Sequence, residues 1–306
     1  RRLRPVYGNW KTKFIQPLKC GESEQPQISG MYFSLKISWL LLSESDHYIY
    51  QKGIAPVELI PIYLTIFIFG LVIGSFLNVC ILRIPQHETI VTERSHCMHC
   101  GYQLSWYDMI PVFSWLVLRG RCRKCKTKIS AQYPIIEALN AALYVLIFAV
   151  CGFTWTSIWY ALFASALLVL SVIDFRTYEI PFGINIFILV LGILQIITDP
   201  GNWLTYVTGF FAVSVPLELI LLISRGRAIG GGDVKLMAAA GLLLGWKNIL
   251  LALVLGCIFG SVIHGIRMKV TDADHTLALG PYLALGCMLA ALWGNVWIDA
   301  YLALFL

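Results

Sequence analysis

Two aspartates lie beside long apolar segments, where charged side chains are rare. Asp174 ends one apolar run, and Asp233 follows three glycines and precedes another run. A charge at membrane depth is costly and usually serves a function. Two carboxyl groups held close together share one proton, so the ionised group activates water while the protonated group donates to a peptide carbonyl. Asp174 and Asp233 are therefore the predicted catalytic pair of an aspartic peptidase.

Each aspartate also has a purely structural interpretation when it is taken alone. Asp174 could cap its helix or pair with Arg176 at the membrane interface. The segment Gly230–Asp233 could be a glycine loop that only caps a helix. The pair gains weight as a catalytic site because the topology predicted below puts both residues on one side of the membrane, together with a predicted zinc module.

The residues around Asp233 predict a pocket. From Asp233 to Trp246 the helix would be about 21 Å long, which is less than the hydrocarbon thickness of about 30 Å. The preceding glycines are predicted to form a non-helical lead-in that lets another backbone come close. Such irregular backbone is tolerated only inside protein or at a watery cavity. The predicted active-site loop is Gly230, Gly231, Gly232 and Lys235.

The helix termini predict which aspartate holds the shared proton. Asp233 lies at a helix N-terminus, where the helix dipole favours the anion. Asp174 lies at a helix C-terminus, where the dipole favours the neutral form. The sequence therefore predicts an ionised Asp233 and a protonated Asp174.

Four cysteines predict a metal site. They form a C-x2-C-x21-C-x2-C pattern made of Cys97, Cys100, Cys122 and Cys125. Two tight turns can direct four sulfurs at one Zn²⁺, although the gap is one residue longer than the usual range. Four sulfurs leave no position for water, so the zinc is expected to be structural. The alternative is two redox-active or inert cysteine pairs, and His96 or His99 is not needed as a ligand.

The composition places these groups in a membrane protein. The chain is 58% hydrophobic and 13% charged, whereas soluble domains average about 25% charged residues. Apolar runs of spanning length predict an all-α integral membrane protein with about eight transmembrane helices. GxxxG pairs at Gly70/Gly74, Gly241/Gly245 and Gly256/Gly260 predict close helix packing. The formal net charge of +6 carries no expectation of a nucleic-acid partner.

The distribution of basic residues predicts the orientation. One set of loops holds most of the Lys and Arg residues, whereas the alternate loops hold only Lys247. Basic loops remain in the cytoplasm, so both aspartates are predicted at cytoplasmic helix ends. The predicted divisions are an extension at 1–55, a first span at 56–82, a cytoplasmic zinc domain at 83–133 and a catalytic bundle at 134–306.

Several motifs occur in an order that resembles one family. The chain is similar to the type IV prepilin peptidases, also called leader peptidase/N-methyltransferases, from about Phe69 to Leu285. Met109 stands where that family is expected to have Asn, and the N-terminal extension is longer. The motifs that carry the resemblance are Gly74–Val79 with Arg83-Ile84-Pro85, the cysteine loop Cys97–Tyr133, Asp174 with Ile180-Pro181, Gly232-Asp233-Val234-Lys235, and Gly280–Leu283.

The resemblance implies a substrate and a second activity. Family members cut the leader of type IV prepilins or type II secretion pseudopilins at the cytoplasmic face of the inner membrane. They then N-methylate the new terminal residue with S-adenosylmethionine. For this chain the methyl-transfer activity has no support from the residues themselves, since no cofactor loop such as GxGxxG is present.

Three other functions compete with this interpretation. A peptidase without methyltransferase activity would share every motif named above. A transporter could also use intramembrane acids, but it leaves the cysteine module and the glycine turn without a role, and no inverted repeat is visible. A membrane scaffold with a zinc platform leaves Asp174 and Asp233 unexplained.

Overall fold

The computed structural model describes residues 56–90, 94–271 and 277–305. In these ranges the chain is helical, with only two isolated β-bridges and no strand. The predicted all-α fold class is confirmed. The predicted extension at 1–55 lies outside the described residues. The other predicted divisions of the chain stay predictions.

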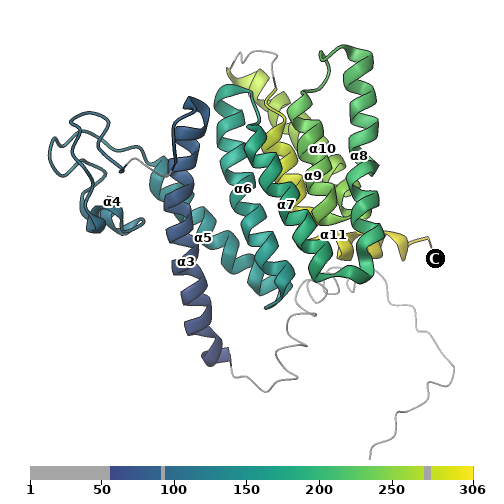
Figure 1. The fold of residues 1–306 in the computed structure, drawn as a ribbon, viewed down its shortest axis with the longest axis horizontal. Helices are drawn as coiled ribbons and strands as arrows, with labels where there is room; N and C mark the ends of the chain where they lie inside the picture. Colours follow the sequence, from purple (N-terminus) through teal and green to yellow (C-terminus); the bar gives the residue numbers. More distant parts are fainter. Residues whose placement is uncertain (1–55, 91–93, 272–276, 306) are drawn as a thin grey trace, which may run out of the picture. The chain divides into compact units, whose positions relative to one another are not determined.

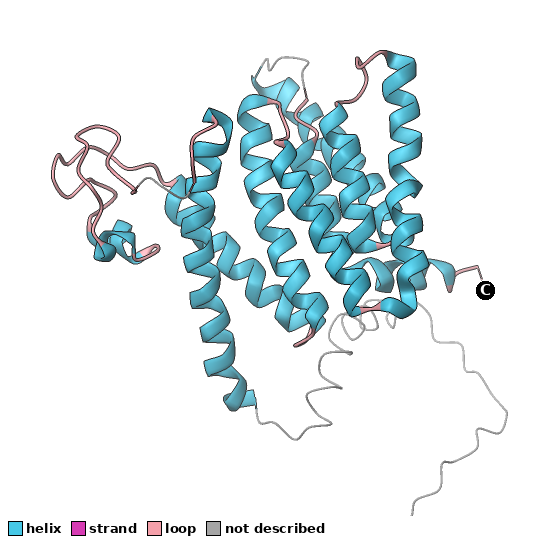
Figure 2. Ribbon diagram, viewed as in Figure 1, coloured by secondary structure: helices cyan, strands magenta, loops and turns pink. Residues whose placement is uncertain are grey.

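Eight long helices take the positions of the predicted spans (Figures 1 and 2). Six of them are long and apolar enough to cross a membrane, while α7 and α9 are shorter, at 17 and 14 residues. A turn at residues 152–154 separates α5 from α6. The helices are α3 (Pro56–Arg83), α5 (Gln132–Cys151), α6 (Trp155–Thr177), α7 (Phe182–Thr198), α8 (Trp203–Ser224), α9 (Gly231–Leu244), α10 (Trp246–Thr271) and α11 (Gly280–Leu302).

The short helix α9 lies at the centre of the helices that follow α6. Every residue from Leu236 to Leu244 is buried, and α9 packs against α7, α8 and α10. A helix that is apolar on all sides belongs inside a bundle. Because protein surrounds α9, its length need not match the lipid thickness. Asp233 can therefore begin a helix that stops short of the membrane surface.

Glycines allow the closest helix contacts. A Cβ built on Gly241 of α9 would lie 2.2 Å from the carbonyl oxygen of Gly209 on α8. A Cβ built on Gly70 or on Gly74 of α3 would lie 2.7 Å from a Cα atom of α5. The predicted packing at these glycines is confirmed, and Gly260 alone makes only ordinary contacts.

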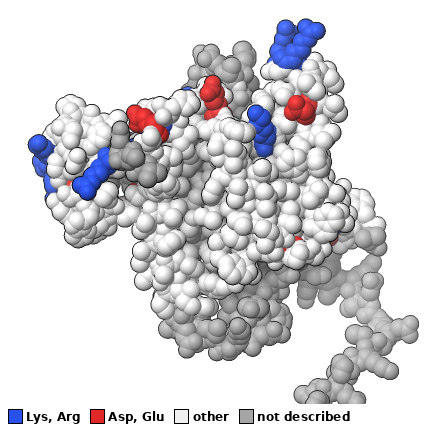
Figure 3. All heavy atoms as spheres, in the orientation of Figure 1, with Lys and Arg blue, Asp and Glu red and all other residues white. Residues whose placement is uncertain are grey.

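The charged side chains gather at one end of the bundle. Figure 3 shows Lys and Arg at the upper end and on the module between α3 and α5, while the flanks are largely uncharged. The ends of α3 and α6 and the starts of α5, α7 and α9 share this end because consecutive helices alternate in direction. The predicted charge asymmetry thus corresponds to a single face of the described bundle.

The α8–α9 crossing supplies a stability test. Gly241→Val would force a side chain into the backbone of α8, which cannot move aside as a flexible side chain could. We expect a cost of about 1–3 kcal/mol and a fall of several degrees in the midpoint of thermal unfolding in detergent. The matched control is Gly265→Val on α10, where nothing lies within 4 Å of the new Cβ. Equal midpoints for the two variants would contradict the close crossing.

Candidate active site and metal site

Asp174 is buried in the last turn of α6. Its Oδ2 atom accepts a hydrogen bond of 2.9 Å from the backbone N–H of Gly280, the first residue of α11. A Cβ on Gly280 would lie 2.6 Å from the same oxygen. Only glycine at this position lets the helix start approach the carboxylate. The sequence motif Gly280–Leu283 therefore begins in direct contact with Asp174.

Asp233 is partly buried in the first turn of α9. The predicted non-helical lead-in of three glycines is wrong, because α9 begins at Gly231 and only Gly230 is an extended N-cap. Glycine at N-cap costs little relative to the usual polar caps, which explains why the helix starts early. At Gly232 the close neighbour is a side chain rather than the predicted backbone, since a Cβ there would lie 2.9 Å from the Cβ of Ile180.

The start of α7 joins the two carboxylate-bearing helices. Asn185 donates a long hydrogen bond of 3.5 Å from Nδ2 to the carbonyl of Gly232. Lys235 does not point to an aspartate, since its Nζ lies over the ring of Phe182 at 5.4 Å from the centroid. The two carboxyl groups are close enough for the charge of Asp174 to act on Asp233. The structure thus gathers α6, α7, α9 and α11 around one acidic pair.

The helix termini do not distinguish the two aspartates in the way that the sequence predicted. Asp174 ends α6, but it also faces the N-terminus of α11 through Gly280. Both carboxyl groups therefore lie at helix N-termini, which favour anions. Each carboxyl group also has a backbone donor, which is Gly280 for Asp174 and Gly230 for Asp233.

An open cavity of about 440 Å³ lies between the end of α6 and the start of α11. It is lined by Ser171, Val172, Phe175, Arg176 and Pro281, and neither aspartate is among these lining residues. The guanidinium of Arg267 on α10 lies over the ring of Phe175, 5.3 Å from its centroid. Pro281 in the cavity wall directly follows Gly280, whose N–H donates to Asp174. The mostly apolar walls suit an apolar ligand segment.

The four predicted cysteines come together in two similar turns. In the first, the N–H of Cys97 bonds to the carbonyl of Tyr102, and in the second the N–H of Cys122 bonds to the carbonyl of Thr127. The residue after the second cysteine of each turn, Gly101 or Lys126, has a positive φ. Each turn therefore aims two sulfurs at a common point.

The sulfur geometry fits one zinc ion. All four Sγ atoms lie within 4.8 Å of one another, and those of Cys97 and Cys125 are 3.8 Å apart. Tetrahedral zinc with Zn–S bonds of about 2.3 Å places sulfurs about 3.8 Å apart. Cys125 Sγ lies 3.3 Å from the hydroxyl oxygen of Thr127, and the contacts with Thr127 lower the pKa of that thiol to about 6. The thiolate is the form that binds a metal, so a thiol that ionises readily is a suitable ligand.

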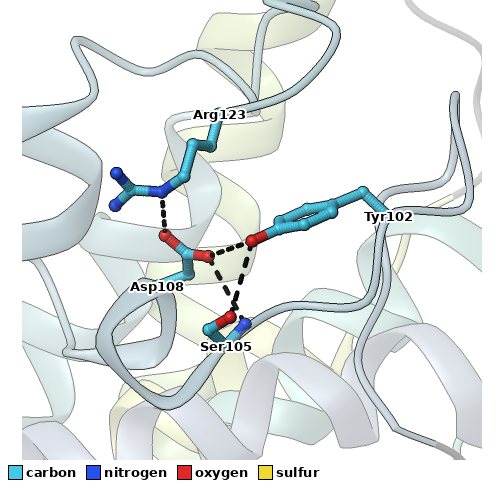
Figure 4. Close-up of polar contacts among 4 residues, drawn as sticks. All are labelled: Tyr102, Ser105, Asp108 and Arg123. Atoms are coloured by element: carbon cyan, nitrogen blue, oxygen red, sulfur yellow. Dashed lines mark hydrogen bonds and ion pairs between the residues drawn. The ribbon is translucent and has the colours of Figure 1, made fainter.

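An ion pair inside the module escaped the sequence analysis. Asp108 Oδ1 accepts a 2.8 Å charge-assisted bond from Nε of Arg123, and its Oδ2 accepts from Tyr102 and from the N–H of Ser105 (Figure 4). The pair raises the pKa of Arg123. Asp108 belongs to the linker, the segment between the two cysteine turns. Because Arg123 lies between the two cysteines of the second turn, the ion pair joins the linker to that turn. Only the capping spacing of Ser105 and Asp108 signals it in the sequence.

A second missed contact joins the module to the bundle. The carboxylate of Glu137 on α5 accepts a 2.7 Å hydrogen bond from the backbone N–H of Val112. Glu137 is buried in the second turn of α5 and faces Val112 of the module. Nearby, the amide of Asn78 on α3 donates to the carbonyl of Tyr133. The first bond ties the module to α5, and the second ties α3 to α5.

The comparisons with known proteins decide the family. Residues 68–151 match the model of the bacterial peptidase A24 N-terminal domain, and residues 161–265 match the type IV leader peptidase family. A prepilin leader peptidase/N-methyltransferase of Stutzerimonas stutzeri is 31% identical over 269 residues, covering 77% of this chain and 92% of that relative. The chain belongs to the type IV leader peptidase family.

Other relatives with the same name agree with this family. That of Bacillus subtilis is 32% identical over 78% of this chain and 96% of its own length. That of Pectobacterium carotovorum is 34% identical over 72% of this chain and 88% of its own length. No solved structure matches the chain. Within the leader peptidase match lie both Asp174 and Asp233, and the N-terminal match contains the cysteine module.

The metal site leads to a direct test. Cys122→Ser removes one of four ligands, so we expect the zinc content of the purified full chain to fall from about one ion to well below half an ion per chain. Inductively coupled plasma mass spectrometry measures it. The matched control is Cys257→Ser, an exposed cysteine of α10 outside the module. Unchanged zinc in Cys122→Ser would refute a four-cysteine site.

Proposed function

We propose that this leader peptidase family member cleaves the leader of type IV prepilins or type II secretion pseudopilins with the pair Asp174 and Asp233. The observation that supports the proposal is the packing of the helices that carry two acids from distant segments, at one end of the bundle and close enough for the charge of Asp174 to act on Asp233. The basic residues at that end support a location at the cytoplasmic face of the bacterial inner membrane. The zinc is structural, because its four ligands lie in the separate module.

Peptide hydrolysis by this pair needs one proton between two carboxyl groups. The ionised aspartate takes a proton from a water molecule, which attacks the scissile carbonyl. The protonated aspartate donates a hydrogen bond to the carbonyl oxygen as negative charge develops there. Protonation of the departing amine then breaks the C–N bond. Lys235 packs over Phe182 at the start of α7, and Gly232 packs against Ile180 just before that helix, so both shape the surroundings of Asp233.

We further propose that the chain N-methylates the new terminus with S-adenosylmethionine. The methyltransferase activity is supported by the names of the relatives and by the family resemblance. The geometry of the described residues supplies no step for it. The methyl donor brings an electrophilic methyl group to the freed amine.

The aspartate pair has a clear kinetic test. Asp174→Asn and Asp233→Asn are each expected to lower the cleavage rate of a purified prepilin at least about a thousandfold, as losses from a catalytic unit do. Gel-shift assays in detergent measure it. Asp199→Asn, at the other end of the bundle and bonded to Tyr206, is the matched control and should keep full activity. Full cleavage by either dyad variant would overturn the proposal.

Labelled methyl donor tests the second half in the same preparation. The dyad variants should still methylate a prepilin supplied already cleaved, since methyl transfer needs no acid pair. Cleavage by the parent chain without label in the product would identify a peptidase that lacks methyltransferase activity.

We also propose that the shared proton rests on Asp233 in the resting site. The Gly280 N–H donates a 2.9 Å hydrogen bond to Asp174 from the start of the long helix α11, which favours the anion of Asp174. Neutron diffraction from deuterated crystals locates the proton, and deuterium on Asp233 with a bare Asp174 is expected. Deuterium on Asp174 beside an ionised Asp233 would refute the assignment.

A further inference from the structure

The zinc module carries an apolar surface that no described residue covers. We call it the docking face and define it as Met109, Ile110, Phe113, Leu116 and Val117, all exposed. Phe113, Leu116 and Val117 lie at positions i, i+3 and i+4 of the short helix α4 (Phe113–Val117), so they share one side. Between them Trp115 faces the opposite way, and its Nε1 donates to the carbonyl of Ile129. The module holds α4 so that its apolar side points outward.

The position of this face relative to the bundle is fixed by one hydrogen bond. Val112, directly before α4, donates its N–H to the buried carboxylate of Glu137. Glu137 lies five residues into α5, about 7.5 Å from its start, and the 20 residues of α5 make a helix of about 30 Å. That length is about the hydrocarbon thickness. The start of α4 therefore lies beside the first turns of α5, near the end of a helix of spanning length.

The backbone at Val112 supports a specific anchor. Its φ of +59° is a conformation that β-branched residues rarely adopt. Such conformations persist only where the surrounding structure holds them in place. Figure 1 shows α4 in the module to the left of α3 in this view. The apolar side of α4 is not covered by the described helices, since Phe113, Leu116 and Val117 are exposed.

The charges of the module select the kind of surface. Between residues 94 and 131 the only acid is Asp108, whose charge Arg123 neutralises. Amphipathic segments with basic residues bind the interface of anionic bilayers. The basic residues of this stretch are Arg94, Arg119, Arg121, Arg123, Lys124, Lys126 and Lys128.

We propose that the docking face inserts into the headgroup region of the bilayer at the charged end of the bundle, where the basic residues that follow α4 bind anionic lipids. The module is then held to the membrane independently of its links to α3 and α5. A second copy of the chain would bring the same excess of positive charge to the face, so like charges would oppose it as the occupant.

Photo-cross-linking in nanodiscs tests this proposal on the full chain. A benzophenone amino acid replaces Phe113 or, separately, Val117, in discs of phosphatidylcholine alone or mixed with phosphatidylglycerol. The matched control position is Met98 in the first cysteine turn, which is 80% exposed against 62% for Phe113. Mass spectrometry should find lipid adducts several-fold more often at 113 and 117 than at 98. Zinc content confirms that each variant is folded.

The outcomes separate the parts of the proposal. Equal lipid adducts at Met98 and Phe113, or adducts at Phe113 with protein in place of lipid, would overturn the docking face. Phosphatidylglycerol should be enriched in the adducts of the parent sequence. Combined Arg119→Gln, Lys126→Gln and Lys128→Gln should remove that enrichment, and its persistence would refute the role of the basic residues.

Discussion

A carboxylate at the edge of the hydrocarbon layer must be compensated by protein, because lipid offers neither charge nor hydrogen bonds. This constraint governs the helices that carry Asp174 and Asp233. Asp174 receives the N–H of Gly280 from a helix that begins 106 residues later in the sequence. Asp233 begins a helix that is buried among its neighbours. The helices around α9 are thus arranged so that two acids can exist at a depth where one alone would be costly.

The same constraint explains why the closest contacts use glycine. A carboxylate can be compensated by a helix N-terminus only if the backbone comes within hydrogen-bonding distance, and Gly280 permits this. A short central helix can be covered only if its neighbours approach closely, and Gly209 and Gly241 permit that. The zinc module meets a different need, since its linker has little core and depends on four sulfurs and the Asp108–Arg123 pair.

The sequence predicted what depends on local pattern. Apolar runs located the helices within a few residues, and cysteine spacing located the metal site. It failed where a contact joins distant segments. Nothing near Glu137 indicates that it accepts a bond from Val112, and nothing near Asp174 indicates the start of α11. The early start of α9 was missed because glycine is a poor helix former, and the packing of Gly232 against Ile180 overrides that preference.

The dependence of Asp174 on Gly280 has a consequence for the timing of synthesis. The chain emerges from the ribosome in order, so α6, α7 and α9 are made before α11. Until α11 arrives, the carboxylate of Asp174 lacks its backbone donor, and the cavity lacks the wall that Pro281 provides. A nascent chain therefore carries both acids without the complete site, and the last helix to be made is the one that assembles it.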